Sequence, residues 1–170
     1  MPTLRLALAL ALASLLGACT IALPVSDGSR GDARQVRLGS PQASAADRAA
    51  LRAVNAVRTG AGLPPLRADA RLQAAAKSHS DWMARTGVHS HIGAGGTNVA
   101  TRIKVAGYCY RAVAENTGFG YPNARRVVEG WLGSAQHRRA IHDRAARDAA
   151  IAATEGNGAM WWTMVIGAPC

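Results

Sequence analysis

The apolar residues of segment 44–60 recur every three to four positions, which predicts an amphipathic helix. Ser44 is a favourable N-cap residue, and Asp47 follows three positions later, as in a capping box. Gly60 and Gly62, followed by two prolines, end the helix. The face that we expect to be buried consists of Leu51, Val54 and Val57.

The same periodicity predicts further helices along the chain. Asp69 caps a second helix, which runs to about Arg85. A short third helix covers 98–107, and a fourth covers 122–134, with one or two more turns directly after it. The apolar stripe of the second helix consists of Leu72, Ala75, Ala76, His79, Trp82 and Met83.

The pattern changes from helical to extended near the C-terminus. Segments 148–154 and 159–168 are strand-like, and they flank the turn-rich sequence EGNG. Segment 109–120 is extended or irregular. Helices followed by an antiparallel hairpin predict the α+β class.

Composition adds a positive charge to this picture. The chain has 170 residues, 49% of them hydrophobic, which suffices for one domain with a core. Lys and Arg number 20 against 10 Asp and Glu, a formal net charge of +10. The arginines are scattered rather than clustered, which favours a solvated basic surface over a polyanion-binding one. We expect no nucleic acid partner.

The N-terminus has the layout of an export signal. One arginine precedes an apolar run that is too short for a comfortable membrane span, so residues 1–18 are predicted to be a signal peptide. The sequence Leu16-Gly17-Ala18-Cys19 resembles the bacterial lipobox, which implies that Cys19 is lipidated and anchors the protein in a membrane. Thr20 in place of Asp favours, by the same resemblance, the outer membrane of a Gram-negative bacterium. The alternative is an ordinary cleaved signal.

Behind the signal, residues 19–43 lack apolar periodicity and are predicted to be the lipidated cysteine with a flexible tether. The folded domain is then 44–170. With Cys19 lipidated, Cys109 and Cys170 remain, and an oxidising compartment favours a disulfide between them. Two free thiols are the alternative.

Common catalytic motifs are absent from the sequence, among them G-x-S-x-G, H-E-x-x-H, the P-loop and the Rossmann fingerprint. What remains is a set of histidines and one glutamate in loop-like surroundings. Glu115 lies in an apolar stretch and needs a partner if it is buried. Together with His91 and His137 it would supply three zinc ligands and leave one position open. A proton-sharing cluster without metal is the alternative.

The order of several segments is more specific than any single motif. It runs NAVRTGAGLPPLRADARLQAAAKSHSDWMA, HSHIG, RIKVAGYCYRAVAEN, VVEGWLGSAQHRRAI and WWTMVIG. This order resembles the bacterial branch of the CAP superfamily, also called the SCP domain, over about residues 45–168. The resemblance implies a three-layer α-β-α sandwich with a small antiparallel sheet.

The family carries two His and two Glu in a cleft in its animal and plant members. By resemblance, His91 matches the first His, Glu115 the first Glu, and His137 a position where bacterial members carry His. At the place of the last family His this chain has Trp161 or Trp162, so the tetrad is incomplete and zinc binding is weakened. The cleft prediction is therefore His91, Glu115 and His137.

We expect the other histidines and several polar residues to lie outside the predicted cleft cluster or to support it. We expect His79 to be a hydrogen-bonded core histidine, His89 to lie outside the cluster, and His142 to lie on the surface. The residues that we expect to support the site or the fold are Asn55, Arg58, Asn116 and Ser134.

Three functions of different classes follow. The first is an envelope-anchored, extracytoplasmic binding module whose cleft holds a small molecule, lipid, glycan or divalent ion such as zinc. The second is a metal-assisted hydrolase, with Glu115 or His91 as the base. The third is a basic adhesive domain for anionic envelope polymers.

Overall fold

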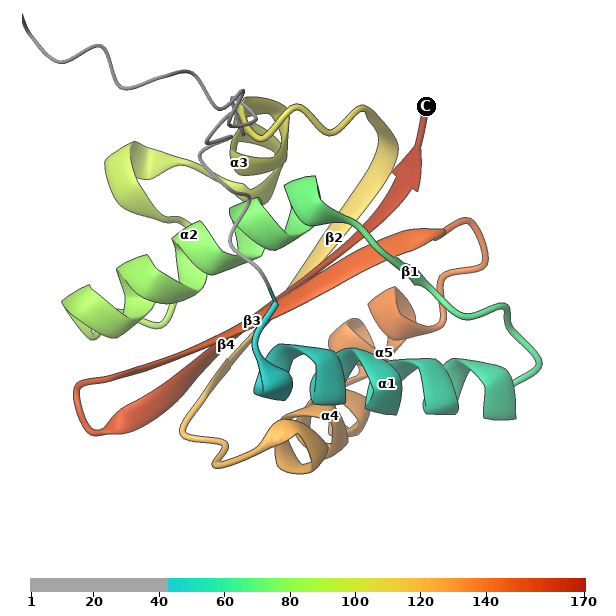
Figure 1. The fold of residues 1–170 in the computed structure, drawn as a ribbon, viewed down its shortest axis with the longest axis horizontal. Helices are drawn as coiled ribbons and strands as arrows, with labels where there is room; N and C mark the ends of the chain where they lie inside the picture. The colour runs from blue at the N-terminus through green and yellow to red at the C-terminus, as the bar shows by residue number, and fades with distance from the viewer. Residues whose placement is uncertain (1–42) are drawn as a thin grey trace, which may run out of the picture. The chain divides into compact units, whose positions relative to one another are not determined.

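The computed structural model describes residues 43–170, which form a twisted sheet covered by helices on both faces (Figure 1). This arrangement confirms the α+β class and the three-layer sandwich predicted from the sequence. The predictions for the signal peptide and Cys19, and for the tether up to residue 42, lie outside the described residues. No helix within 43–170 is long and apolar enough to cross a membrane.

One helical layer consists of α1 (Ala45–Gly60), α4 (Ala124–Gly133) and α5 (Ala135–Ile141). The predicted capping box of α1 is present: the Asp47 amide donates to the Ser44 hydroxyl, and the Ser44 amide donates to the Asp47 carboxylate at 2.8 Å. Sequence periodicity therefore located these helices to within about two residues.

The other layer consists of α2 (Ala70–Thr86), the 3₁₀ turn η1 (Ala94–Gly96) and α3 (Val99–Val105). Asp69 caps α2, as predicted, and Asn98 caps α3 by accepting a hydrogen bond from the Thr101 amide. A long connection, 87–98, joins the two helices and carries His89 and His91.

The sheet has the strand order β1-β3-β4-β2, from β1 (Arg67–Ala68), β3 (Asp148–Gly156), β4 (Ala159–Pro169) and β2 (Tyr110–Phe119). The predicted hairpin is β3–β4, and its turn residues Asn157 and Gly158 both have positive φ, as a type I′ turn requires. The two-residue β1 pairs parallel with β3, so the sheet is mixed rather than purely antiparallel. Strand β1 was missed because two exposed residues carry no periodic signal.

Each sheet face has its own apolar core because side chains alternate along β3 and β4. Ile151 of β3 faces the α1–α4–α5 layer, whereas its neighbours on either side face α2 and α3. The first core includes Val54, Trp131, Ile141, Ile151, Trp162, Met164 and Ile166. The second includes Leu72, Ala76, Ile103, Ala150, Ala152 and Val165.

A disulfide joins Cys109 and Cys170, whose Cα atoms are 5.5 Å apart, and confirms the predicted pairing. It links the start of the edge strand β2 to the end of β4 across a sequence separation of 61 residues. The expected structural residue Arg58 is fully buried and donates to the carbonyl oxygens of Ile141 and Asp143. These bonds hold the end of α5 against α1.

Candidate functional site

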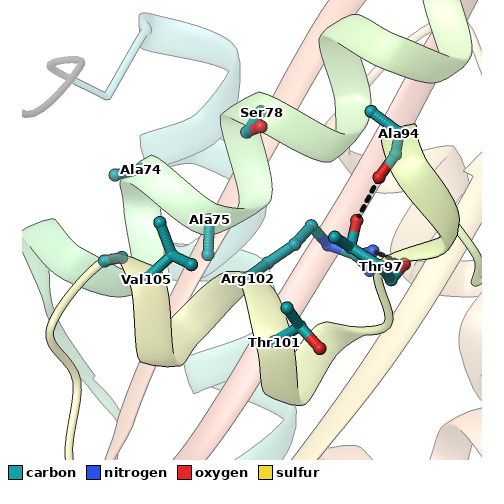
Figure 2. A pocket seen from close by; sticks show the side chains of 9 residues that line it. Ala74, Ala75, Ser78, Ala94, Thr97, Thr101, Arg102 and Val105 are labelled. Atoms are coloured by element: carbon teal, nitrogen blue, oxygen red, sulfur yellow. Dashed lines mark hydrogen bonds between the residues drawn. The ribbon is translucent and has the colours of Figure 1, made fainter.

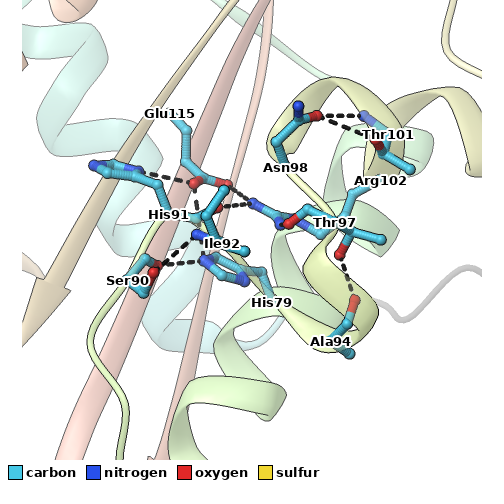
Figure 3. A network of polar contacts seen from close by, with 10 residues as sticks. All are labelled: His79, Ser90, His91, Ile92, Ala94, Thr97, Asn98, Thr101, Arg102 and Glu115. Carbon is cyan, nitrogen blue, oxygen red and sulfur yellow. Dashed lines mark hydrogen bonds and ion pairs between the residues drawn. The ribbon is translucent and has the colours of Figure 1, made fainter.

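Glu115 lies on the edge strand β2, opposite Val165 of β4, and its side chain is only 3% exposed. It points toward the α2–α3 layer, where its carboxylate meets side chains from both helices (Figure 3). The next residue, Asn116, points to the opposite face and donates to the His137 carbonyl oxygen at 3.1 Å. The site is therefore assembled around the sheet edge from both helical layers.

Arg102 of α3 neutralises the Glu115 carboxylate from inside the protein. Its Nη2 donates to Glu115 Oε2 at 2.6 Å, and the Arg102 side chain is only 6% exposed. The same guanidinium donates to the carbonyl oxygens of Thr97, at 2.7 Å, and His91, at 3.2 Å. Arg102 thus fixes Glu115 and the backbone of the 87–98 connection at once.

His91 is held by the other carboxylate oxygen. Its Nδ1 donates to Glu115 Oε1 at 3.0 Å, although the imidazole itself is 52% exposed. This hydrogen bond raises the pKa of His91 above its ordinary value, against a smaller opposing effect of burial. An exposed imidazole with a buried carboxylate behind Nδ1 has its Nε2 available for a ligand or a proton.

His79 lies behind this pair and confirms the prediction of a hydrogen-bonded core histidine. Its Nε2 donates to the Ser90 carbonyl oxygen at 2.7 Å and lies 3.8 Å from Glu115 Oε1, beyond hydrogen-bond distance. Burial lowers the pKa of His79, which keeps the ring neutral beside Arg102. A Cβ on Gly93 would lie 2.9 Å from His79 Nδ1, so this connection can pass here only with glycine.

His137, from α5, belongs to the same neighbourhood. Burial lowers the pKa of His137, and the positive charges of His91 and His89 lower it further. The expected support from Ser134 is present, because it is the N-cap of α5 and accepts from the His137 amide at 3.5 Å. Burial likewise lowers the pKa of His89.

His89 does not contact Glu115 but lies over an aromatic pair. Its ring centroid is 6.2 Å from Phe119 and 6.5 Å from Trp161, and those two rings are 4.3 Å apart. Phe119 is 48% exposed, so an apolar surface adjoins the imidazoles. His142, expected on the surface, is half-buried at the end of α5, where its Nδ1 donates to the Arg138 carbonyl oxygen.

The zinc site predicted from His91, Glu115 and His137 does not fit this arrangement well. Within residues 43–170, no group of three or more His, Cys, Asp or Glu side chains is placed to hold a metal ion. Both Glu115 oxygens already accept hydrogen bonds, one of them from a guanidinium that cannot lose its proton. A cation bound to Glu115 would be repelled by Arg102 at close range.

Arg102 also borders a groove between α2 and α3, with a volume of about 310 Å³ (Figure 2). Its wall is largely apolar, and the Arg102 side chain reaches from α3 toward Thr97 in Figure 2 and toward Glu115 in Figure 3. The lining residues include Ala74, Ala75, Ser78, Thr101, Val105 and Ala106. The guanidinium therefore lies between this groove and the predicted cluster of His91, Glu115 and His137, which is called the histidine cluster below.

Sequence reasoning missed Arg102, the central cation of the site. Its one signal is its position directly before Ile103, which is fully buried between α3 and the sheet. The same short helix has no acidic residue one turn away that could pair with the arginine. A buried arginine needs a carboxylate, and Glu115, in its apolar stretch, was expected to need a partner. Joining the two requirements would have paired them.

Solved structures with the same fold come from several organisms. An extracellular protein containing an SCP domain from Bacillus anthracis is 18% identical with a TM-score of 0.64, and the match covers 71% of this chain and 39% of that one. An outer surface protein from Borrelia burgdorferi is 19% identical with a TM-score of 0.65, covering 71% and 90%. Venom allergen-like protein 4 from Schistosoma mansoni is 12% identical with a TM-score of 0.55, covering 75% and 90%. At these identities the likeness shows the fold.

A family model described as "CAP: Cysteine-rich secretory protein family" matches residues 51–166. This range includes most of α1, all the other helices, and His91, Glu115 and His137. A comparison with curated protein sequences finds no match.

Proposed function

Because this chain belongs to the cysteine-rich secretory protein (CAP) family, we propose that it is an exported, non-enzymatic binding module. The observation that carries the proposal is the way in which His91 is held. The imidazole is 52% exposed, yet its orientation is set by a hydrogen bond to a carboxylate that is 3% exposed. A polar group presented to solvent in a fixed geometry is suited to binding a ligand without the entropic cost of ordering it.

The surroundings of His91 favour an organic ligand that is both polar and apolar. The raised pKa of His91 favours a hydrogen-bond donor at Nε2, whereas the lowered pKa of His137 favours a neutral ring that can donate or accept. The exposed ring of Phe119, which neighbours His89, adds apolar surface at the end of the same strand as Glu115. A small molecule, lipid or glycan with a hydrogen-bond acceptor next to an apolar face has this chemistry.

Export and anchoring are part of the same proposal. Residues 1–18 have the layout of a signal peptide, and Cys19 follows a lipobox-like sequence. We expect Cys19→Ser to move the protein from the membrane fraction to the soluble fraction. Density-gradient separation of wild-type membranes should place the protein in the outer membrane. Retention of Cys19→Ser in the membrane fraction would contradict lipid anchoring.

Binding can be tested with envelope polymers as probes. The full-length protein, purified in detergent, is sedimented with peptidoglycan sacculi or with lipopolysaccharide vesicles. We expect His91→Ala and His137→Ala to reduce the bound fraction, because the proposal places the ligand against both imidazoles. With peptidoglycan as the probe, His142→Ala is the matched control, since His142 is the C-cap of the helix that carries His137 and bonds to that helix's own backbone. Unchanged binding in both cluster variants would contradict this ligand site.

A hydrolase is supported by one observation, the carboxylate–imidazole pair itself. A carboxylate bonded to Nδ1 orients the ring so that Nε2 can act as a general base. Glu115→Gln separates the two functions. If the protein hydrolyses an ester or peptide probe, the substitution abolishes turnover and spares binding. If the protein is a binding module, the wild type does not hydrolyse the probe and Glu115→Gln weakens binding.

The polyanion-binding alternative is supported by a basic hollow on α5. Arg138, Arg139 and His142 line a cavity of about 400 Å³. In this case, binding to lipopolysaccharide would fall steeply as salt concentration rises. Arg138→Ala and His142→Ala would reduce it, whereas His91→Ala would not.

A further inference from the structure

The negative charge on Glu115 is balanced by a cation that belongs to the protein. Arg102 Nη2 lies 2.6 Å from Glu115 Oε2, and both side chains are more than nine-tenths buried. We propose that Arg102 is the resident cation of this site, and that its guanidinium takes the position beside Glu115 that a divalent metal would need. The histidine cluster therefore works without a metal ion bound to Glu115.

The geometry keeps Arg102 in place. Two backbone carbonyl oxygens, those of Thr97 and His91, accept hydrogen bonds from the same guanidinium. On the other side, a Cβ on Gly93 would lie 3.0 Å from Arg102 Nη1, so the chain closes tightly over the group. To bind Glu115 Oε2, a metal would have to break the 2.6 Å contact and leave a buried, permanently charged guanidinium without its carboxylate.

This internal pairing also determines which ligands the cluster accepts. The charges of Glu115 and Arg102 cancel, so no net negative charge faces His91. Groups that accept a hydrogen bond, whether neutral or anionic, are then favoured over cations. The inference concerns the charge of the site and does not depend on export or on the identity of the ligand.

The first test is zinc titration by calorimetry on the full-length protein, wild type against Glu115→Gln. Glutamine keeps the shape of the side chain and one acceptor oxygen for Arg102 or His91. If Glu115 is not a metal ligand, any zinc affinity of the wild type changes by less than about threefold. A larger loss of zinc affinity in a folded Glu115→Gln protein would overturn the proposal.

The second test removes the cation. Arg102→Gln frees the carboxylate, so zinc affinity should rise about tenfold or more, and the double variant with Glu115→Gln should lose that gain. Arg102→Lys is the matched control, because it retains a positive charge and should show no gain. Circular dichroism and thermal melting verify folding. A folded Arg102→Gln protein without a Glu115-dependent gain refutes the proposal, and if this variant does not fold, the first test decides.

Discussion

The buried Arg102–Glu115 pair allows a quantitative test of what holds the site together. Replacing Arg102 by Met removes the guanidinium but keeps an unbranched apolar side chain. It leaves Glu115 Oε2 and the carbonyl oxygens of Thr97 and His91 without their donor. Because the carboxylate is 3% exposed, water cannot replace that donor. Breaking a buried pair from one side costs about 3–5 kcal/mol, a large fraction of the stability of a domain this size.

Urea denaturation followed by tryptophan fluorescence would measure this loss at neutral pH. A double-mutant cycle with Glu115→Gln identifies its source, because the double variant no longer contains an unpaired charge. We expect it to lose less stability than the sum of the two single variants. Arg126→Met, at an exposed ion pair with Glu129, is the control and should cost less than about 1 kcal/mol. A loss below about 1 kcal/mol for Arg102→Met, or simple additivity, would refute the reasoning.

Three further predictions follow from single features. Replacing both cysteines of the disulfide by serine should lower the free energy of unfolding by about 4 kcal/mol in the chain-entropy model, measured by urea denaturation. Gly93→Ala should lower the melting temperature, because its Cβ would overlap His79, whereas Gly60→Ala, with no atom within 4 Å of its Cβ, should not. Glu115→Gln should lower the pKa of His91, measured by NMR titration. Since the pKa of His91 is raised in the folded state, protonated His91 bonded to Glu115 stabilises the fold. This contribution to the free energy of unfolding is present below pH about 6.5 and is lost as pH rises through the folded pKa. Exposure of the ring keeps the effect small.

Much of the fold could be predicted because its signals are local. Caps such as Ser44 and Asp69, helical periodicity and the Asn157-Gly158 turn each act within a few residues. The disulfide followed from counting cysteines once Cys19 was assigned to lipid. In contrast, β1 is formed only by pairing with β3, a partner 81 positions further along the chain, so no local pattern indicates it.

The site was predicted in part. The pairing of Glu115 with His91 agrees with their selection from the sequence, whereas a metal-ligand role for these residues stays a prediction. Arg102 was missed because it compensates a charge on another element, β2, so neither helical periodicity nor strand alternation links the two residues. His89 lies against Phe119 and Trp161, whereas the ring that Glu115 holds by a hydrogen bond is that of His91.

The topology of the sheet has a consequence for the order of folding. The β3–β4 hairpin closes over a two-residue turn, whereas β2 must find β4 across the intervening helices α4 and α5. Loop-closure entropy makes the local pairing fast and the distant one slow. We therefore expect the hairpin to belong to the folding nucleus and β2, with Glu115, to dock late. The sheet edge that carries Glu115 would then be the last part of the domain to mature, and the first to open under stress.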